Sequence, residues 1–277
     1  MEEVKVTKKP QKKKVLNSLL ISPYYFILFA LILIPILIMV VYSFTEGESR
    51  NFFQVSFTFK NYTSFFVNNV YLYAMQRSIW LAILTTLATL IIGYPLAYFI
   101  TQTKPRTQGL LIVLISAPMW INLVIRTIAL QQIIEMIIPD ILGTNTAMVI
   151  GLVHVFLPFM VLPIYTVLQK IDHGLIEAAT DLGASNFKAF LKVTFPLSLT
   201  GVMSGILMVF LPAATTLVIP KYLGNNVFLI GNLIERVSIL AGDIGYGSAI
   251  AIVLSIVMMV MILLVRKIDK FKEVEDD

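Results

Sequence analysis

The chain has 277 residues, of which 58% are hydrophobic and only 13% are charged, and its formal net charge is +5 at pH 7. This composition is too apolar for a soluble globular domain. The absence of cysteine excludes disulfides, thiolate catalysis and cysteine-ligated metal sites, and two histidines are too few for a multi-histidine metal site. The composition therefore predicts an integral membrane protein.

Six stretches without Asp, Glu, Lys or Arg are each long enough to cross a bilayer as a helix of about 20 residues. We expect six transmembrane helices, near 20–44, 78–100, 108–128, 147–168, 197–219 and 246–266. Prolines inside the fourth and fifth spans predict bent or broken helices, which membranes tolerate where the backbone is buried in protein or lines a cavity. In the fifth span Gly201 and Gly205 have the G-x-x-x-G spacing, which predicts that another helix approaches closely. The expected fold class is all-α, a polytopic helix bundle around a pathway.

Lysine and arginine fix the expected orientation. If the N-terminus is cytoplasmic, fifteen of the 21 basic residues lie in the inside segments 1–14, 104–106, 170–192 and 266–272. The positive-inside rule then places both termini in the cytoplasm. We expect a basic cytoplasmic tail (1–18), a transmembrane domain (19–268) and an acidic cytoplasmic tail (269–277). The basic run beside the first span is more typical of a topology anchor on anionic lipid than of a nucleic-acid site.

The most informative segment lies between the fourth and fifth spans, where residues 177–196 read E-A-A-T-D-L-G-A-S-N-F-K-A-F-L-K-V-T-F-P. Asp172 is placed to cap a short helix, and Gly183 is placed to end it. Ser185 is placed to cap a second helix, which we expect Pro196 to close. The apolar residues of the second helix are spaced to share one face: Phe187, Phe190, Leu191 and Phe195. Two short helices joined by a glycine elbow predict a rigid knob on the cytoplasmic side.

The same segment resembles the EAA loop of ABC-importer permeases. Its Glu-Ala-Ala, its glycine and its final proline match that pattern, although Val193 and Phe195 replace the usual Ile and Leu. In that family the loop docks into a separate ATPase subunit, so the resemblance implies that 170–196 is a cytoplasmic coupling loop. The residues implied in ATPase coupling are Glu177, Ala178, Ala179, Asp181, Gly183 and Pro196. An ordinary amphipathic loop between spans is the alternative.

Three further stretches, 118–126, 157–165 and 229–234, resemble spermidine/putrescine permeases of the PotB type. The resemblance covers most of residues 20–266. It implies the type I ABC-importer permease fold in a bacterial cell membrane. The implied partners are a PotC-type second permease, PotA-type ATPase subunits and a PotD-type extracytoplasmic binding protein, with no cofactor and no nucleic acid.

A polyamine substrate carries two or more ammonium groups. A site for it needs spaced carboxylates and aromatic faces, each cation–π contact contributing about 1–2 kcal/mol when desolvated. The residues we expect along such a pathway are Trp120, Asn122, Glu135, Asp140, Tyr94, Tyr98, Phe156, Tyr222, Asn226, Glu235 and Asp243. For any single member the alternative is an interfacial aromatic residue or a solvated loop acid.

Two residues within the spans do not suit a cationic substrate directly. Arg126 would repel an ammonium group, and it could either snorkel to the interface or pair with Glu135. His154 could serve a proton relay, but a lone histidine is more typical of a hydrogen bond to a neighbouring helix.

The chain contains no Gly-Lys dipeptide and therefore no phosphate-binding loop, so we expect neither ATP hydrolysis nor other enzyme activity. Two alternatives to a polyamine permease remain. One is an ABC-importer permease for another small solute. The other is an ion-coupled secondary transporter, which would need ionisable residues within the spans and internal repeats; the charge-free spans argue against it.

Overall fold

The computed structural model describes residues 23–24, 26–45, 57–225 and 227–273. Within these ranges the chain is helical, and its only strand-like feature is an isolated bridge between Thr45 and Phe57. Five helices are long and apolar enough to cross a membrane, and a bent pair of helices would make a sixth span. The predicted all-α class is confirmed, and the six predicted spans correspond to these five helices and the bent pair.

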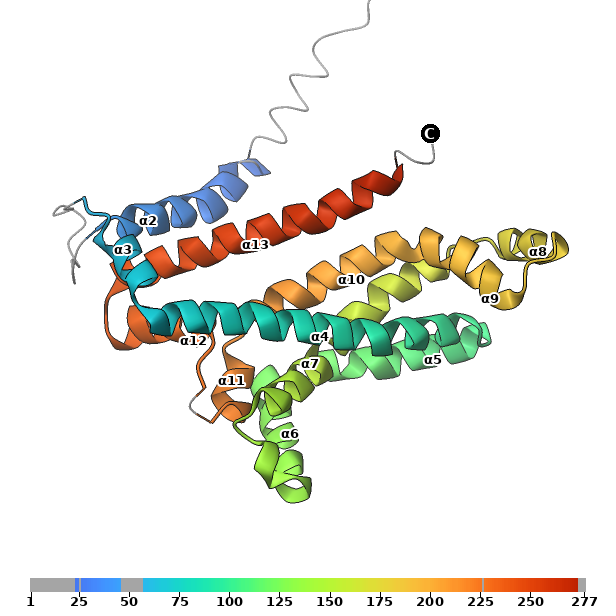
Figure 1. Ribbon diagram of the computed structural model, residues 1–277, viewed down its shortest axis with the longest axis horizontal. Helices are drawn as coiled ribbons and strands as arrows, with labels where there is room; N and C mark the ends of the chain where they lie inside the picture. The colour runs from blue at the N-terminus through green and yellow to red at the C-terminus, as the bar shows by residue number, and fades with distance from the viewer. Residues whose placement is uncertain (1–22, 25, 46–56, 226, 274–277) are drawn as a thin grey trace, which may run out of the picture.

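The long helices run along the long axis of the molecule, with α8 and α9 at one end and α3 and α12 at the other (Figure 1). In chain order the elements are η1 (Phe29–Leu33), α2 (Ile34–Ser43), α3 (Lys60–Val67), α4 (Asn69–Thr101), α5 (Pro105–Ser116), η2 (Ala117–Trp120), α6 (Leu123–Ile137), η3 (Pro139–Ile141), α7 (Asn145–Leu168), α8 (His173–Asp181), α9 (Asn186–Ala189), η4 (Phe190–Thr194), α10 (Phe195–Thr215), α11 (Val218–Leu223), α12 (Ile230–Glu235), η5 (Arg236–Leu240) and α13 (Ile244–Glu273). Here η2 and η3 are 3-10 helices, whereas η1, η4 and η5 are π-helical turns.

The core is formed by α4, α7 and α10, which pack against one another along the bundle. Close approach of α10 to α7 depends on Gly201. A Cβ added there would lie 2.9 Å from the carbonyl oxygen of Pro163 and 3.1 Å from Cα of Ile164. Gly205, one turn further on, faces Met160 in the same way. The close helix approach predicted from the G-x-x-x-G spacing is therefore confirmed.

Two predicted span boundaries are wrong. The second span begins at Asn69 rather than near 78, because the helix continues through Arg77, whose guanidinium binds the side-chain oxygen of Asn145 on α7. The fifth span was expected from 197, but one continuous helical stretch runs from Asn186 to Thr215. The part of this helix that precedes Pro196 and the apolar part that follows it are therefore a single rod.

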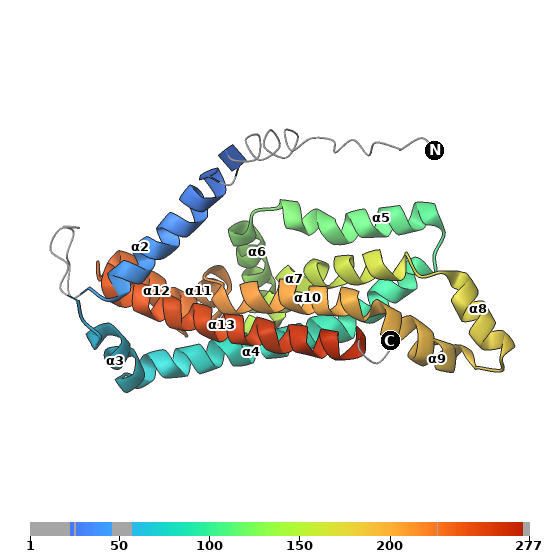
Figure 2. The ribbon, with the colours of Figure 1, turned by 90° about the horizontal axis from the view of Figure 1, so that it is seen from above.

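The third span is also unlike the straight helix predicted over 108–128. The stretch Pro105–Trp120 meets Leu123–Ile137 at a bend of 98°. Ile121 is extended at the break, and the side chain of the next residue, Asn122, accepts the N–H of Val124 at 2.9 Å, which starts α6 as a new helix. Figure 1 shows α6 turning away from the direction of the long helices, while Figure 2 shows α5 running beside the bundle. Residues 120–123 therefore form an elbow.

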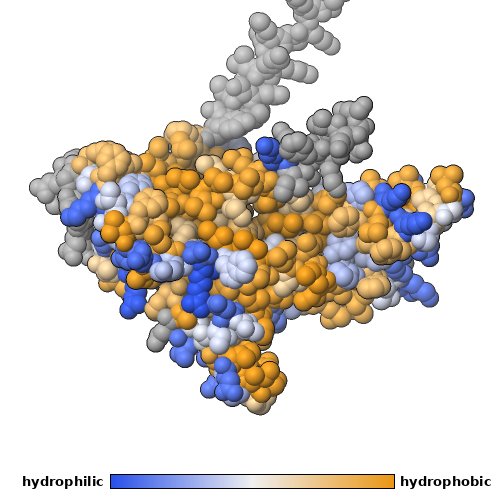
Figure 3. All heavy atoms as spheres, in the orientation of Figure 1, coloured by the Kyte–Doolittle hydropathy of each residue, from blue (hydrophilic) through white to orange (hydrophobic). Residues whose placement is uncertain are grey.

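Apolar side chains cover the flanks of the long helices, and hydrophilic ones lie mainly toward the two ends (Figure 3). This distribution is expected for a protein whose flanks meet lipid or another membrane subunit. At the C-terminal end α13 continues as a helix to Glu273, into the segment assigned to the acidic tail. The predicted basic tail and residues 274–277 lie outside the described residues.

Candidate functional site

The segment between α7 and α10 is built by three local signals that the sequence predicts correctly. The carboxylate of Asp172 accepts the N–H of Gly174 at 2.9 Å and caps α8. Gly183 ends that helix at φ +86°, a conformation that favours glycine, and its N–H binds the carbonyl of Thr180 at 2.9 Å. The hydroxyl of Ser185 then accepts the N–H of Lys188 at 3.4 Å and begins α9. We call residues 172–196 the coupling segment, after the coupling role that the sequence predicts for them.

The coupling segment stands at one end of the bundle (Figure 1) and presents both charge and apolar surface. Glu177, Ala178 and Asp181 are exposed on α8, and Ala179 is half-buried. Leu182, next to Gly183, is 90% exposed. The other exposed large apolar side chains of the segment are Leu175, Phe187, Leu191 and Phe195. Apolar groups gathered at a polar end of a protein commonly mark an interaction surface.

Two expectations for the second helix of this segment are wrong. Pro196 does not close the unit but lies in the first turn of α10, within the continuous helical rod. Proline lacks an N–H and collides with the carbonyl four residues earlier, so an undisturbed α-helix cannot pass through it. The wider π-helical turn η4 ends at Thr194, two residues before Pro196, and accommodates it. The expected single apolar face is divided as well, because Phe190 turns inward whereas Phe187 is 68% exposed.

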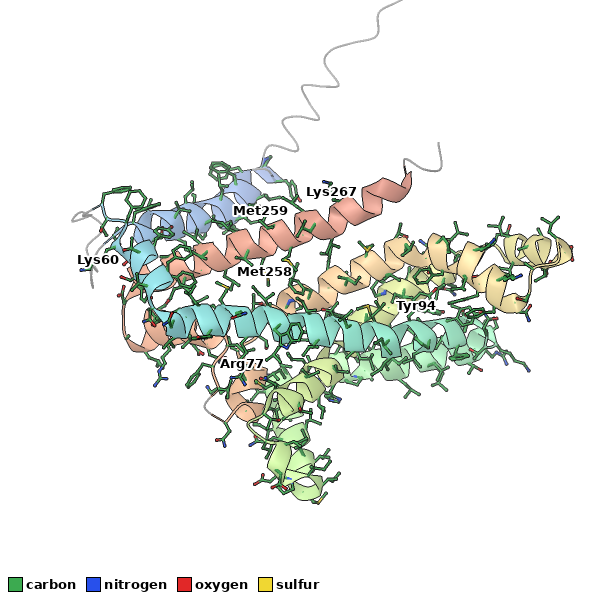
Figure 4. The ribbon with its side chains drawn as sticks, in the orientation of Figure 1. Lys60, Arg77, Tyr94, Met258, Met259 and Lys267 are labelled. Carbon is green, nitrogen blue, oxygen red and sulfur yellow. The ribbon has the colours of Figure 1, made fainter. Side chains whose placement is uncertain are left out.

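Tyr94 and Tyr98, expected as pathway walls, contact the coupling segment. Tyr94 is only 8% exposed, and its hydroxyl lies 2.8 Å from the hydroxyl of Ser198. The ring of Phe190 meets the rings of both tyrosines edge to face, at centroid distances of 5.9 Å for Tyr94 and 5.2 Å for Tyr98. Figure 4 shows Tyr94 on α4, toward the end of the bundle that carries α8 and α9. In this conformation Tyr94 is thus closed off from a passing solute by its own neighbours.

The elbow brings together Trp120, Asn122 and Arg126. Trp120 is 81% exposed, whereas Arg126 is only 9% exposed. The guanidinium of Arg126 donates to the carbonyl of Pro118 at 2.5 Å and to the carbonyl of Val155 on α7 at 3.1 Å. Arg126 therefore neither snorkels nor pairs with Glu135, but ties the elbow to α7 through backbone carbonyls.

The remaining pathway candidates do not gather into one cluster. Glu135 and Asp140 are exposed on α6 and η3, Glu235 is half-buried on α12, and the carboxylate of Asp243 caps α13 by accepting the N–H of Tyr246 at 2.9 Å. Phe156 on α7 is buried and Tyr222 on α11 is half-buried, while Asn226 lies outside the described residues. Among the residues that the structure describes, no three acidic or histidine side chains come close enough to hold a metal ion.

His154 lies exposed on α7, and among the residues that the structure describes it makes none of the hydrogen bonds to a neighbouring helix that the sequence led us to expect. Two buried polar residues matter more, although no sequence motif singles them out. The hydroxyl of Ser78 on α4 accepts the N–H of Ile230 at 2.8 Å, and the side-chain amide of Asn232 donates to the carbonyl of Leu217 at 2.9 Å. These two bonds fix α12 inside the bundle. The sequence points to Ser78 and Asn232 only in that each is a polar residue within an apolar stretch.

Comparison with known proteins agrees with this architecture. Residues 89–273 match the family described as the binding-protein-dependent transport system inner membrane component. The chain is 34% identical over 255 residues to the spermidine/putrescine transport system permease protein PotB of Haemophilus influenzae, covering 86% of this chain and 89% of that protein. The PotB protein of Escherichia coli is 34% identical over 248 residues, covering 84% of this chain and 90% of that protein.

Solved structures share the fold at low sequence identity. A bacterial ABC transporter involved in import of the acidic polysaccharide alginate superposes with a TM-score of 0.74 at 15% identity, covering 93% of this chain and 97% of that one. The methionine ABC transporter MetNI, in an inward-facing conformation, gives a TM-score of 0.56 at 17% identity, covering 73% and 94%. These likenesses show the fold alone. Family, fold and relatives together identify the chain as a multi-pass, non-catalytic inner-membrane permease of the ABC importers, in the family of the PotB-type spermidine/putrescine permeases.

Proposed function

We propose that this chain is a permease subunit of an ATP-driven importer of spermidine or putrescine. It forms half of the translocation pathway together with a PotC-type permease. PotA-type ATPase subunits dock on the coupling segment, and a PotD-type binding protein delivers the substrate to the outer face. The observation that carries the substrate class is the 34% identity to PotB over 86% of the chain.

The exposed surface of the coupling segment supports the docking step. With both termini in the cytoplasm, α8 and α9 face the compartment that holds ATP. Burying the exposed side chains of Leu182 and Phe187 in a groove of the ATPase would contribute about 25 cal/mol for each Å² of apolar surface removed from water. The small side chain of Ala178 lets α8 approach the groove closely, and the exposed carboxylates of Glu177 and Asp181 add charge to one side.

The elbow supports a pathway shared with a second subunit. The helical stretch from Pro105 to Trp120 rises about 24 Å from the cytoplasmic turn at about 1.5 Å per residue. The elbow therefore lies within a hydrocarbon core about 30 Å thick. A break in the backbone at that depth is tolerated only if protein covers it or it lines a water-filled cavity. We infer that the second permease covers one side of the elbow and that Trp120 and Asn122 face the pathway.

Uptake of labelled spermidine is the test of this function. The chain is reconstituted in liposomes with its PotC-type, PotA-type and PotD-type partners, with and without ATP on the cytoplasmic side. ATP-dependent accumulation is the expected result. ATPase activity that the binding protein stimulates, without accumulation of spermidine or putrescine, would retain the importer and reject the polyamine.

Substitutions in the coupling segment test the docking step separately. We expect Gly183→Pro and Glu177→Lys to abolish uptake without preventing membrane insertion. The first replaces the positive φ that ends α8, and the second reverses a charge on α8. Gln102→Lys is the control, since it adds a positive charge at the exposed end of α4, outside the segment. Normal uptake by both segment variants would rule out this site of coupling.

The alternative is a permease for another small solute, which the alginate transporter illustrates because the same fold imports an acidic polysaccharide. Two acids of the predicted pathway, Glu135 (exposed) and Glu235 (half-buried), decide between the two. If the substrate is a polyamine, Glu135→Gln or Glu235→Gln should weaken uptake of the longer polyamine more than that of the shorter one. Asp243 is less suitable for this test because its carboxylate caps α13. Unchanged uptake by both glutamine variants would reject these acids as the substrate contacts.

A further inference from the structure

We propose that four aromatic rings form the joint through which the coupling segment moves α4 and α10 as one body, and that loosening this joint separates ATP hydrolysis from transport. The rings are those of Tyr94, Tyr98, Phe190 and Phe195, which we call the aromatic clasp. The inference rests on the proposed coupling function and adds to it the residues that carry the motion from the segment into the membrane.

The rings of the clasp come from both sides of the joint. Tyr94 and Tyr98 lie one turn apart on α4, Phe190 opens the π-helical turn η4, and Phe195 opens α10. Besides its two edge-to-face contacts with the tyrosines, the Phe190 ring lies 6.5 Å from the Phe195 ring. The Phe195 ring in turn lies 5.7 Å from that of Tyr94. Phe190 is therefore the central member, in contact with the other three rings.

A chain of hydroxyl groups reinforces the clasp. The hydroxyl of Ser198 donates to the carbonyl of Phe195 at 2.9 Å. Since a serine hydroxyl has one proton, the 2.8 Å contact between Ser198 and Tyr94 has the tyrosine as donor. Tyr94 and Ser198 are both buried, so water cannot replace these bonds. The first turn of α10 is thereby bound to α4 by polar as well as aromatic contacts.

The clasp is needed because the helical rod from Asn186 to Thr215 changes from α-helix to π-helix at η4, between the coupling segment and the membrane. A π-helical turn followed by Pro196 interrupts the regular hydrogen-bond ladder between α9 and α10. Such interruptions are where helices bend. A force applied to the coupling segment would be absorbed by bending at η4 unless other contacts hold that turn in place. The clasp spans this turn from Phe190 to Phe195.

The first helix of the segment offers only a minor second route into the bundle. Within the described part of the chain, α8 packs chiefly on η4 and α9 rather than on the membrane helices. Its Ile176 borders a cavity of about 70 Å³ that Tyr98, Gln108 and Leu168 also line. A displacement of α8 therefore reaches the bundle mainly through η4, where the clasp holds it.

The test measures ATP hydrolysed per spermidine transported in the complete reconstituted importer. Phe190→Ala removes the central ring, and we expect the ratio to rise at least about fivefold while ATPase activity is retained. Tyr94→Phe keeps the ring and removes only the hydroxyl that bonds Ser198. We expect the ratio to rise about fivefold, which corresponds to the loss of one hydrogen bond. Leu197→Ala is the control, because it removes exposed apolar atoms from the same turn outside the clasp and should leave the ratio unchanged.

A second readout is independent of the substrate. The chain has no cysteine, so cysteines introduced at Gln102 and Lys188 carry spin labels specifically on the exposed end of α4 and on the coupling segment. Phe190→Ala should broaden the distance distribution between the two labels, and Leu197→Ala should leave it narrow. If wild-type importer takes up no spermidine, the polyamine assignment fails while this comparison still decides the clasp. The inference would be overturned if Phe190→Ala kept the wild-type ratio of ATP hydrolysed to spermidine transported or a narrow distance distribution. It would also be overturned if Tyr94→Phe kept the wild-type ratio.

Discussion

Replacing Gly201 by alanine should destabilise the fold more than any other glycine-to-alanine change along the contact between α10 and α7. The added Cβ would lie 2.9 Å from the carbonyl oxygen of Pro163, 3.0 Å from a methyl group of Val167 and 3.1 Å from Cα of Ile164. Ordinary van der Waals contact begins near 3.4 Å, so the two helices would have to separate by about 0.5 Å. Two of the three obstacles are backbone atoms and cannot rotate aside.

The expected magnitude follows from two opposing terms. Overpacking of this kind costs typically 1–3 kcal/mol. Alanine gains about 1 kcal/mol over glycine in helix propensity. Because two of the three obstacles are backbone atoms, we take the upper end of the overpacking cost, which leaves a net loss of about 2 kcal/mol for Gly201→Ala. Gly205→Ala should cost about 1 kcal/mol or less, because its nearest obstacle, at 2.7 Å, is the flexible thioether of Met160, and the backbone atoms of Met160 lie further away, at 3.2 Å and 3.4 Å.

Thermal unfolding of the purified chain in detergent is the assay, with intrinsic fluorescence as the signal. For a chain of this size about 1 kcal/mol corresponds to about 2–4 °C, so Gly201→Ala should lower Tm by about 5 °C. Gly109→Ala is the control, since nothing lies within 4 Å of its added Cβ on α5, and Tm should rise by about 2 °C. A Tm for Gly201→Ala at or above that of Gly205→Ala would refute the reasoning from backbone contact.

Three further changes test local structure. Gly183→Ala places a side chain at φ +86° and should cost about 1–2 kcal/mol, detected as several-fold faster proteolysis within the coupling segment. Asp172→Ala should cost about 1 kcal/mol by removing the cap of α8 and speed its amide hydrogen exchange about fivefold, whereas Asp172→Asn should retain the cap. Asn61→Ala should cost about 1–3 kcal/mol, measured as a fall in Tm, because the carbonyls of Ser43 and Thr45 lose the amide donor that now lies 3.0 Å and 2.8 Å away.

The predictions that succeeded rest on local chemistry. Asp172, Gly183 and Ser185 act as caps or stops within a few residues of themselves, and each does so in the structure. The Gly201 and Gly205 spacing likewise allows the helix approach it predicts, because a missing Cβ has the same effect in any packing partner. The composition of the chain indicates the membrane environment by itself, because composition does not depend on which residues contact one another.

The predictions that failed rest either on a local change of helix geometry or on a contact with a residue far along the chain. Pro196 does not end its helix, because the π-helical turn before it supplies the room that a regular helix lacks. Arg126 finds carbonyls of Pro118 and Val155, the second of them 29 residues away, instead of Glu135. Nothing in the local sequence indicates either outcome.

By itself the sequence determined that this protein is a membrane-embedded helical permease with a capped polar segment between its fourth and fifth spans. Hydrophobic length, basic-residue placement and capping residues act over one helix or less, so they can be read along the chain. Only the tertiary structure decided that the third span breaks into an elbow and that Tyr94 closes on Phe190 and Ser198. Arg126 ties the elbow to α7, and Tyr94 on α4 meets η4 and α10, so both features depend on partners that are far apart in the chain.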